Sequence, residues 1–177
     1  MNGRLFPDGF HLVLLEKSHQ RSAFDCGEEQ VNNWLRTKAL QNQKKRLSST
    51  KVLLDSEKRI AGFYTLATGQ VDFSDLPIEI SRKLPQRPLP IAVLAWLGVS
   101  SSHQKQGLGT LLLAHALRDC HRAGETFAFV ALIIDCINDS AKAFYQHWNF
   151  TELPGYSNRF FLSAQLLSEI ATSAELP

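Results

Sequence analysis

The sequence has few residues that could cross-link the chain or bind a metal. Its three cysteines, Cys26, Cys120 and Cys136, are an odd and widely spaced set with no Cys-x-x-Cys pair. Such a set argues against a disulfide framework and against a zinc site. The six histidines are isolated, and none forms a metal-binding spacing such as His-Glu-x-x-His. We therefore predict that the protein binds no metal.

Long apolar runs and an export signal are also missing. The longest apolar runs, at residues 91–99 and 127–134, are too short to span a bilayer as helices. Residues 1–7 contain no apolar stretch followed by a small-residue cleavage site. We expect a cytoplasmic protein without a membrane partner. The 177 residues suffice for one domain, residues 1–177, with a substantial core.

The net charge is only +2, but the basic residues are concentrated in two places. Such concentrations can attract an anionic partner, although a charge run most often forms a solvated helix face. By themselves, these basic groups do not favour a nucleic-acid site over a solvated helix face. The first group, which lacks acidic residues, is Arg36, Lys38, Lys44, Lys45, Arg46 and Lys51, and the second is Arg82, Lys83 and Arg87.

Apolar runs and turn residues alternate in an order that predicts a partly parallel α/β sheet. Residues 25–29 supply a capping aspartate and early acids for a helix that includes Val31, Leu35 and Ala39. The prolines within residues 77–90 predict a surface segment, and a later helix should end before Gly124. We predict strands at residues 10–15, 51–54, 60–67, 91–99, 127–135, 150–152 and 159–162, and further helices at 107–121 and 138–148.

The connection at residues 99–110 joins an apolar strand to an apolar helix. Gly107 and Gly109 leave the backbone N–H groups accessible, and unpaired amides at a helix N-terminus favour a pyrophosphate. The segment has no Gly-Lys-[Ser/Thr], and Leu112 stands where a dinucleotide fingerprint has its third glycine. The glycines alone also fit an ordinary strand-to-helix turn.

Residues 104–109, Gln-Lys-Gln-Gly-Leu-Gly, match the [Gln/Arg]-x-x-Gly-x-[Gly/Ala] signature of the GNAT N-acetyltransferases, and residues 138–145 resemble that family's Asn-x-x-Ala-x-x-[Phe/Leu]-Tyr element. The resemblance implies an α/β (α+β) fold with a twisted, mixed sheet of six or seven strands flanked by helices. It places acetyl-CoA in the cleft between two central parallel strands. The implied cofactor-binding residues are Leu97, Gly98, Val99, Gln104, Lys105, Gln106, Gly107, Leu108, Gly109, Thr110, Asn138, Ala141 and Phe144.

By the same resemblance, Tyr145 is the catalytic general acid, which protonates the departing CoA thiolate. The plain alternative is a tyrosine that only packs in the core. Asn149 stands where the family usually has glycine, and we predict a left-handed backbone there, which asparagine tolerates. Residues 91–99 and 127–134 contain no acid that could act as general base. This favours an α-amine, with a pKa of ~7.7–8.0, over a lysine at ~10.4 as acceptor.

A narrower group, the GNAT toxins of bacterial toxin–antitoxin modules, is resembled by residues 24–27, 31–35, 39, 60–66, 84–85 and 88–91. Membership implies acetylation of the α-amine of aminoacyl-tRNA, which blocks translation. It also implies a ribbon-helix-helix antitoxin, a homodimer, and DNA binding only through the antitoxin complex. Trp96 replaces an arginine that this group often has. The resemblance therefore does not indicate which aminoacyl group is acetylated. The residues expected to bind tRNA are Arg36, Lys38, Lys44, Lys45, Arg46, Arg82, Lys83 and Arg87.

Two other functions remain open from the sequence. The protein could acetylate a protein N-terminus or a small-molecule amine, which would need neither tRNA nor the basic groups. It could also be a non-catalytic CoA-binding domain, in which Tyr145 only packs.

Overall fold

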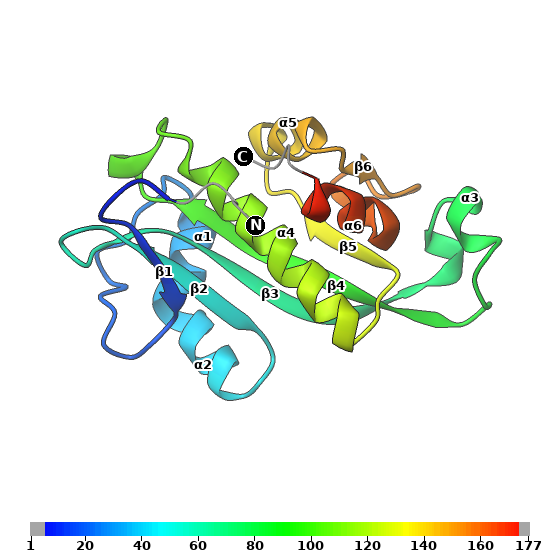
Figure 1. Ribbon diagram of the computed structural model, residues 1–177, viewed down its shortest axis with the longest axis horizontal. Coiled ribbons are helices and arrows are strands. Elements are labelled where there is room, and N and C mark those ends of the chain that lie inside the picture. Colours follow the sequence, from blue (N-terminus) through cyan, green and yellow to red (C-terminus); the bar gives the residue numbers. More distant parts are fainter. Residues whose placement is uncertain (1–5, 174–177) are drawn as a thin grey trace. The chain divides into compact units, whose positions relative to one another are not determined.

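The computed structural model describes residues 6–173, and within them seven strands form one sheet in the order β1-β2-β3-β4-β5-β7-β6 (Figure 1). Residues 1–5, which entered the argument against an export signal, lie outside this range. The predicted mixed sheet is confirmed. Its strands are β1 (His11–Leu14), β2 (Ser49–Leu54), β3 (Ile60–Asp72), β4 (Pro88–Val99), β5 (Ala131–Asp135), β6 (Thr151–Glu152) and β7 (Arg159–Ser163).

The helices fall between these strands and after the last one. Two of them, η2 and η3, are 3-10 turns, and η1 is a π-helical segment that separates α1 from α2. The helices are α1 (Glu29–Asn33), η1 (Trp34–Lys38), α2 (Ala39–Lys44), η2 (Phe73–Asp75), α3 (Ile78–Ser81), η3 (Ser101–His103), α4 (Leu108–Thr126), α5 (Asp139–His147) and α6 (Ala164–Thr172). Within the described range, no helix is long and apolar enough to cross a membrane.

The sheet is mixed because its two edges are antiparallel and its centre contains a parallel pair. Strand β2 pairs antiparallel with β1 and with β3. Strand β5 pairs parallel with β4, with Ile91 opposite Ala131, and antiparallel with β7. Two parallel neighbours require a crossover connection, and helix α4 supplies it.

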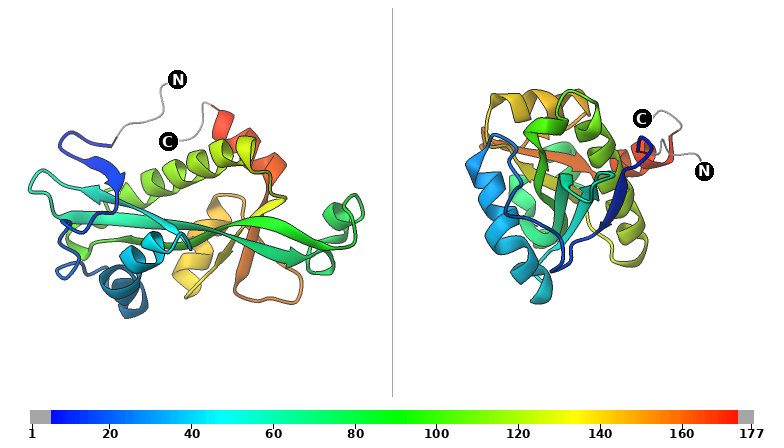
Figure 2. Two further views of the ribbon diagram at one scale, coloured as in Figure 1. Left: turned by 90° about the horizontal axis from the view of Figure 1, so that it is seen from below. Right: turned by 90° about the vertical axis from the view of Figure 1, so that its left-hand side faces the viewer.

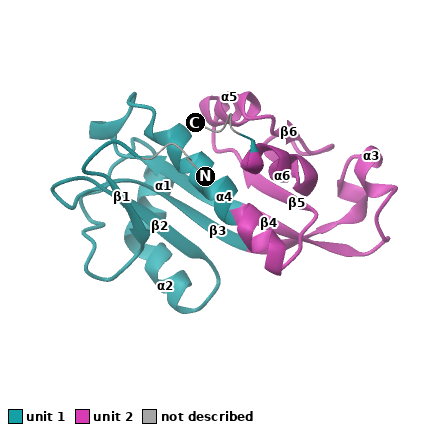
Figure 3. Ribbon diagram, viewed as in Figure 1, with its two compact units in different colours: residues 1–67, 94–119, 173–177 teal, residues 68–93, 120–172 magenta. Residues whose placement is uncertain are grey.

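The chain divides into two compact units, shown in different colours in Figure 3. Unit 1 comprises the chain up to Ala67 together with Leu94–Asp119, and unit 2 comprises Thr68–Val93 and Cys120–Thr172. Strands β3 and β4 and helix α4 each contribute residues to both units.

In unit 1, helices α1 and α2 cover one face of the strands and the first part of α4 covers the other (Figure 2). Val31, Leu35 and Ala39 are buried, as their spacing predicted, and they pack in one cluster with Phe24 and Phe63. The side chain of Asp25 does not cap α1, contrary to the prediction, since the N-cap is Glu28 and the helix begins at Glu29.

In unit 2, α5 and α6 lie on opposite faces of β5 and β7 (Figure 2). Residues 131–134 are all buried, as expected for a strand covered on both faces. The prediction that this strand begins at Phe127 is wrong, because Phe127 is 81% exposed and its amide donates to the Ala123 carbonyl. Helix α4 also runs past Gly124, and the Phe129 ring packs where a Cβ of Gly124 would lie.

The proline-rich segment was only partly predicted. It contains α3, with η2 immediately before it, and β4 begins at Pro88, three residues before the predicted strand. Pro88 and Pro90 are exposed while Leu89 between them is buried, and the Pro90 carbonyl accepts a hydrogen bond from the Val130 amide. Prolines fit this part of the strand because its pairing with β5 starts only at Ile91. Helix α6 was not predicted.

Candidate functional site

The connection from β4 to α4 has the backbone geometry of an anion-binding loop. Gly107 has φ +79° and Lys105 has φ +62°, so both lie in the left-handed region. Among the described residues, no atom lies within 4 Å of the position a Cβ of Gly107 would take. The first amides of a helix have no partner inside it, and such amides bind phosphate oxygens. The residues present therefore fit a pyrophosphate group.

The residues predicted to bind the cofactor differ in exposure along this segment. Leu97 and Val99 are half-buried, whereas the loop at residues 104–107 is exposed. Leu108 is only 1% exposed, so its side chain packs in the core. Gly109 and Thr110 are half-buried in the first turn of α4.

Gly98 has a packing reason to be glycine. A Cβ on Gly98 would lie 2.9 Å from Cγ1 of Val31 and 3.3 Å from Cε1 of Phe63. Gly62, on the neighbouring strand β3, lies close to Gly98, since a Cβ added to Gly62 would lie 3.0 Å from the Gly98 carbonyl oxygen. Strand β4 therefore lies close to β3 and α1 immediately before the loop begins.

Backbone amides fix the start of the loop. The Ser100 amide donates to the Ala61 carbonyl, and the Ser101 amide donates to the Asp25 carbonyl, both at 2.8 Å. The Gln104 side chain donates to two further carbonyls, those of Cys26 and Val99. The loop is thus held before any ligand binds.

Helix α5 places Tyr145 in the apolar interior of unit 2. The Asn138 side chain caps this helix by accepting a hydrogen bond from the Ala141 amide at 2.8 Å. Tyr145 is 5% exposed, and its ring packs edge-on against Phe144 and Phe150. Burial, with a smaller contribution from the thiol of Cys136, raises the pKa of the Tyr145 hydroxyl. Its proton is therefore retained throughout the neutral range.

Cys136 and Asn149 flank the same helix. Burial raises the pKa of the Cys136 thiol to about 11, so this cysteine is an unreactive thiol rather than a thiolate. Asn149 has φ +67°, which confirms the left-handed conformation predicted for this position. The Asn149 amide donates to the Gln146 carbonyl and ends the helix.

The predicted tRNA-binding residues do not share one environment. Lys38, Lys44, Lys45 and Arg46 are exposed on and after η1 and α2, whereas Arg36 donates to the Phe24 carbonyl at 2.5 Å and contacts Glu29. Arg36 therefore also holds the chain that precedes α1. The second group, Arg82, Lys83 and Arg87, is exposed after α3 in unit 2.

Trp96 contributes to a stack that the sequence did not reveal. Its ring lies on that of Trp34 with 5.4 Å between centroids and 15° between planes. The Trp34 indole donates to Thr65 Oγ1 at 3.1 Å, and Thr65 shares a hydrogen bond with Thr50. Both tryptophans come from segments far apart in the sequence, so only the fold brings them together.

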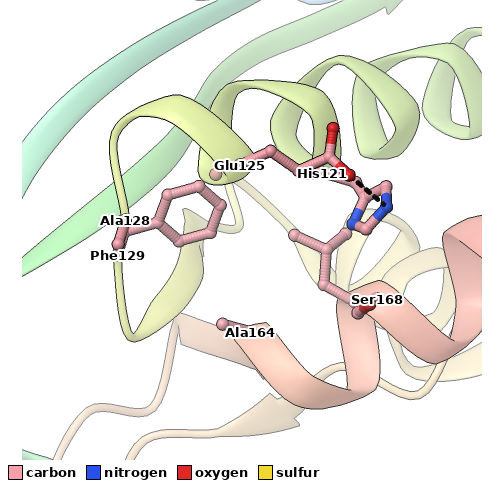
Figure 4. A pocket seen from close by; sticks show the side chains of 8 residues that line it. His121, Glu125, Ala128, Phe129, Ala164 and Ser168 are labelled. Atoms are coloured by element: carbon pink, nitrogen blue, oxygen red, sulfur yellow. Dashed lines mark ion pairs between the residues drawn. The ribbon is translucent and has the colours of Figure 1, made fainter.

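A hollow of about 200 Å³ lies in unit 2 where the end of α4 faces α6 (Figure 4). It contains neither the loop at 104–107 nor Tyr145. His121 and Glu125, one turn apart on α4, lie on its rim with 4.0 Å between Nε2 and Oε1. The remaining lining residues are Gly124, Ala128, Phe129, Ala164, Leu167 and Ser168.

A mixed sheet with a crossover helix that begins at a glycine-rich loop, followed by a capped helix with a buried tyrosine, is the arrangement expected of the acetyltransferase family that the sequence motifs resemble. The sequence profile of the acetyltransferase (GNAT) family matches residues 14–150. The chain therefore belongs to this family.

Comparison with individual proteins shows which members of the family this chain resembles. A "tRNA-acetylating toxin" of Mycobacterium tuberculosis is 34% identical over 133 residues, which cover 75% of this chain and 79% of the relative. A tyrosine-to-phenylalanine mutant of KacT has a TM-score of 0.86 at 26% identity, and AtaT complexed with acetyl-methionyl-tRNA has 0.84 at 25%. Each structure covers 92% of this chain and 99% of its own.

Related structures contain other partners. AtaTR is bound with acetyl-CoA, AtaT is bound to the C-terminus of the antitoxin AtaR, and KacTA is bound to DNA. They are 23–26% identical to this chain, with TM-scores of 0.75–0.82, and cover 91–94% of this chain and 97–100% of their own.

Proposed function

We propose that the protein is the toxin of a toxin–antitoxin module and transfers acetyl from acetyl-CoA to the α-amine of aminoacyl-tRNA. The observation that carries the acceptor class is the 34% identity to a tRNA-acetylating toxin over 75% of the chain. The resemblance of residues 24–27 and 31–35 to the GNAT toxins also supports it.

Acetyl-CoA supplies an activated thioester. The left-handed turns at Lys105 and Gly107 and the first amides of α4 support a pyrophosphate site at the loop. We assign the other cofactor contacts to the residues of the two family motifs, Leu97–Val99, Gln104–Thr110, Asn138, Ala141 and Phe144.

The transfer forms a bond between the acceptor nitrogen and the acetyl carbon and breaks the carbon–sulfur bond. Tyr145 donates its hydroxyl proton to the departing sulfur, a role supported by its position in the family's Asn-x-x-Ala-x-x-[Phe/Leu]-Tyr element. The acceptor must lose a proton as it attacks. Residues 91–99 and 131–134 carry no acidic side chain, which supports an α-amine that is partly neutral at physiological pH.

The exposed cations Lys38, Lys44, Lys45 and Arg46 on unit 1, with Arg82, Lys83 and Arg87 on unit 2, would contact tRNA phosphates. Contacts of this kind position a nucleic acid without reading its sequence. Arg36 is assigned a smaller share of this binding, because its guanidinium already donates to the Phe24 carbonyl.

The partners follow from the same assignment. An antitoxin, of the ribbon-helix-helix type that the resemblance implies, would neutralise the enzyme, and DNA would be bound only by that complex. A homodimer is the expected state of the free toxin. Since aminoacyl-tRNA is the substrate, the protein would act in the cytoplasm.

A protein N-terminus is also an α-amine. The absence of an acidic side chain from residues 91–99 and 131–134 is therefore equally compatible with a protein N-terminus as acceptor. The test is to incubate the purified protein with labelled acetyl-CoA and a full set of charged tRNAs, and in parallel with peptides that have free N-termini. We expect label on one or a few aminoacyl-tRNAs and none on peptides. Label on peptides alone would replace the tRNA assignment with an N-terminal acetyltransferase.

A further inference from the structure

The side chain of Gln104 uses both of its amide hydrogens on backbone carbonyls. Its Nε2 lies 2.9 Å from the Cys26 carbonyl oxygen and 2.9 Å from the Val99 carbonyl oxygen. A primary amide nitrogen has only two hydrogens to donate. In this arrangement Gln104 therefore offers no N–H group to a phosphate, although it is the first residue of the phosphate-loop signature.

The Cys26 carbonyl belongs to a turn, residues 25–27, that a buried side chain holds in shape. Asn32 is 2% exposed, and its Oδ1 accepts from the Cys26 amide at 2.8 Å while its Nδ2 donates to Asp25 Oδ1 at 2.9 Å. The same Asp25 oxygen accepts from the Gly27 amide. The Gly27 amide and then the Asn32 amide lower the pKa of Asp25, so its carboxylate remains ionised and keeps accepting.

Two successive carbonyls of this 25–27 turn face the loop. The Asp25 carbonyl accepts from the Ser101 amide at 2.8 Å, and the Cys26 carbonyl accepts from Gln104. The turn therefore holds the loop at its start and again immediately before Lys105, where the backbone becomes left-handed.

We infer that Gln104 and Asn32 are positioning residues for acetyl-CoA: their side chains hold residues 104–107 in the conformation that presents backbone amides to the pyrophosphate and do not themselves touch the cofactor. This inference rests on the acetyl-CoA binding of the proposed function. A loop that is ordered before binding loses less conformational entropy when the ligand arrives, and this difference appears as affinity.

Gln104→Met tests the role directly, because methionine has a similar length, no charge and no donor. The matched control is Gln20→Met, a substitution of an exposed glutamine in the same unit. Two quantities are measured on the purified full chain: the Kd for CoA by calorimetry, and hydrogen exchange of the amides at residues 100–110 in the free protein.

We expect Gln104→Met to raise the Kd about tenfold, which corresponds to about 1.4 kcal/mol, and to accelerate exchange of the loop amides before CoA is added. The melting temperature of Gln104→Met should stay close to that of wild type. Gln20→Met should leave both the Kd and the amide exchange close to their wild-type values. An unchanged Kd would overturn the inference. So would a raised Kd with unchanged exchange in the free protein, because Gln104 would then contact the cofactor directly. A wild-type protein that fails to bind CoA would instead overturn the proposed function itself.

Asn32→Ala independently tests the link between the 25–27 turn and the loop at residues 104–107. Because Asn32 acts through the 25–27 turn, its removal should accelerate exchange of the same loop amides, and the double variant with Gln104→Met should bind CoA no more weakly than the weaker single variant. Fully additive losses in the double variant would mean that the two residues act separately, which contradicts the linkage.

Discussion

Asp55 lies against His103, with 3.2 Å between Oδ2 and Nε2, and this contact joins the turn between β2 and β3 to the 3-10 turn η3 before the loop at residues 104–107. Both side chains are largely buried, at 6% and 12% exposure. Burial alone would raise the pKa of Asp55, but hydrogen bonds from the Arg59 amide, the Arg59 guanidinium and the Glu57 amide lower it below its usual value.

Asp55→Asn should lower the free energy of unfolding by about 1–2 kcal/mol at pH 7, because the charge-assisted hydrogen bond from the Arg59 guanidinium is lost. A carboxylate whose pKa is depressed by folding stabilises the protein above its unfolded pKa of about 3.9 and loses that contribution as the pH falls through the folded value. Urea unfolding at pH 7 and below pH 4 should therefore show the difference from wild type shrinking in acid. Asp8→Asn, at an exposed aspartate, is the control, and a pH-independent difference would contradict the assignment.

Gly98→Ala should destabilise the protein by about 1–3 kcal/mol, since the added methyl would meet Val31 Cγ1 at 2.9 Å and overpack the core. Gly109→Ala is the matched comparison, because there a Cβ would lie 3.7 Å from Val99 Cγ2, an ordinary contact. Thermal unfolding of the two variants measures the effect. Equal melting temperatures would show that β3, β4 and α1 are not packed as tightly as described.

The Tyr145 hydroxyl should stay protonated beyond the range in which an exposed tyrosine, with a pKa of about 10, ionises. Because folding raises its pKa, ultraviolet difference titration of wild type against Tyr145→Phe should show no ionisation from this residue near pH 10. At neutral pH the transfer rate should rise as the acceptor amine loses its proton. A difference signal centred near pH 10 would show that the hydroxyl is not buried as described.

Lys44→Glu and Lys45→Glu should each weaken tRNA acetylation, chiefly through KM for tRNA, since they reverse exposed charges expected to meet phosphates. Each lost phosphate contact reduces the slope of log(kcat/KM) against log salt by about one. Lys17→Glu carries the same charge change at an exposed lysine outside the predicted tRNA-binding residues and should leave that slope unchanged. Unaltered kinetics in both test variants at moderate salt would contradict the assignment of Lys44 and Lys45 to tRNA binding.

Local sequence signals predicted the parts of the fold that depend on neighbouring residues. The loop glycines and the left-handed Asn149 each follow from backbone conformations that few residue types tolerate. Gly124 misled the prediction because glycine is tolerated inside a helix at about 1 kcal/mol, and tertiary packing against Phe129 outweighs that cost.

Contacts between distant segments could not be predicted in this way. Gln104 and Cys26 are 78 residues apart, and nothing in either segment indicates that the amide of one meets the carbonyl of the other. The stack of Trp34 on Trp96 likewise depends on the register of β4 beneath η1. Such pairs emerge only when the strands are ordered in the sheet.

The central claim is acetyl transfer to aminoacyl-tRNA with Tyr145 as the acid, and the amount of acetylated aminoacyl-tRNA formed per enzyme by wild type and by Tyr145→Phe tests it most directly. We predict that wild type acetylates its charged tRNA and that Tyr145→Phe does so about 10²–10⁴-fold more slowly, with the Kd for CoA unchanged. Equal rates in the two proteins, or no acetylation of any charged tRNA by a wild type that binds acetyl-CoA, would contradict the account.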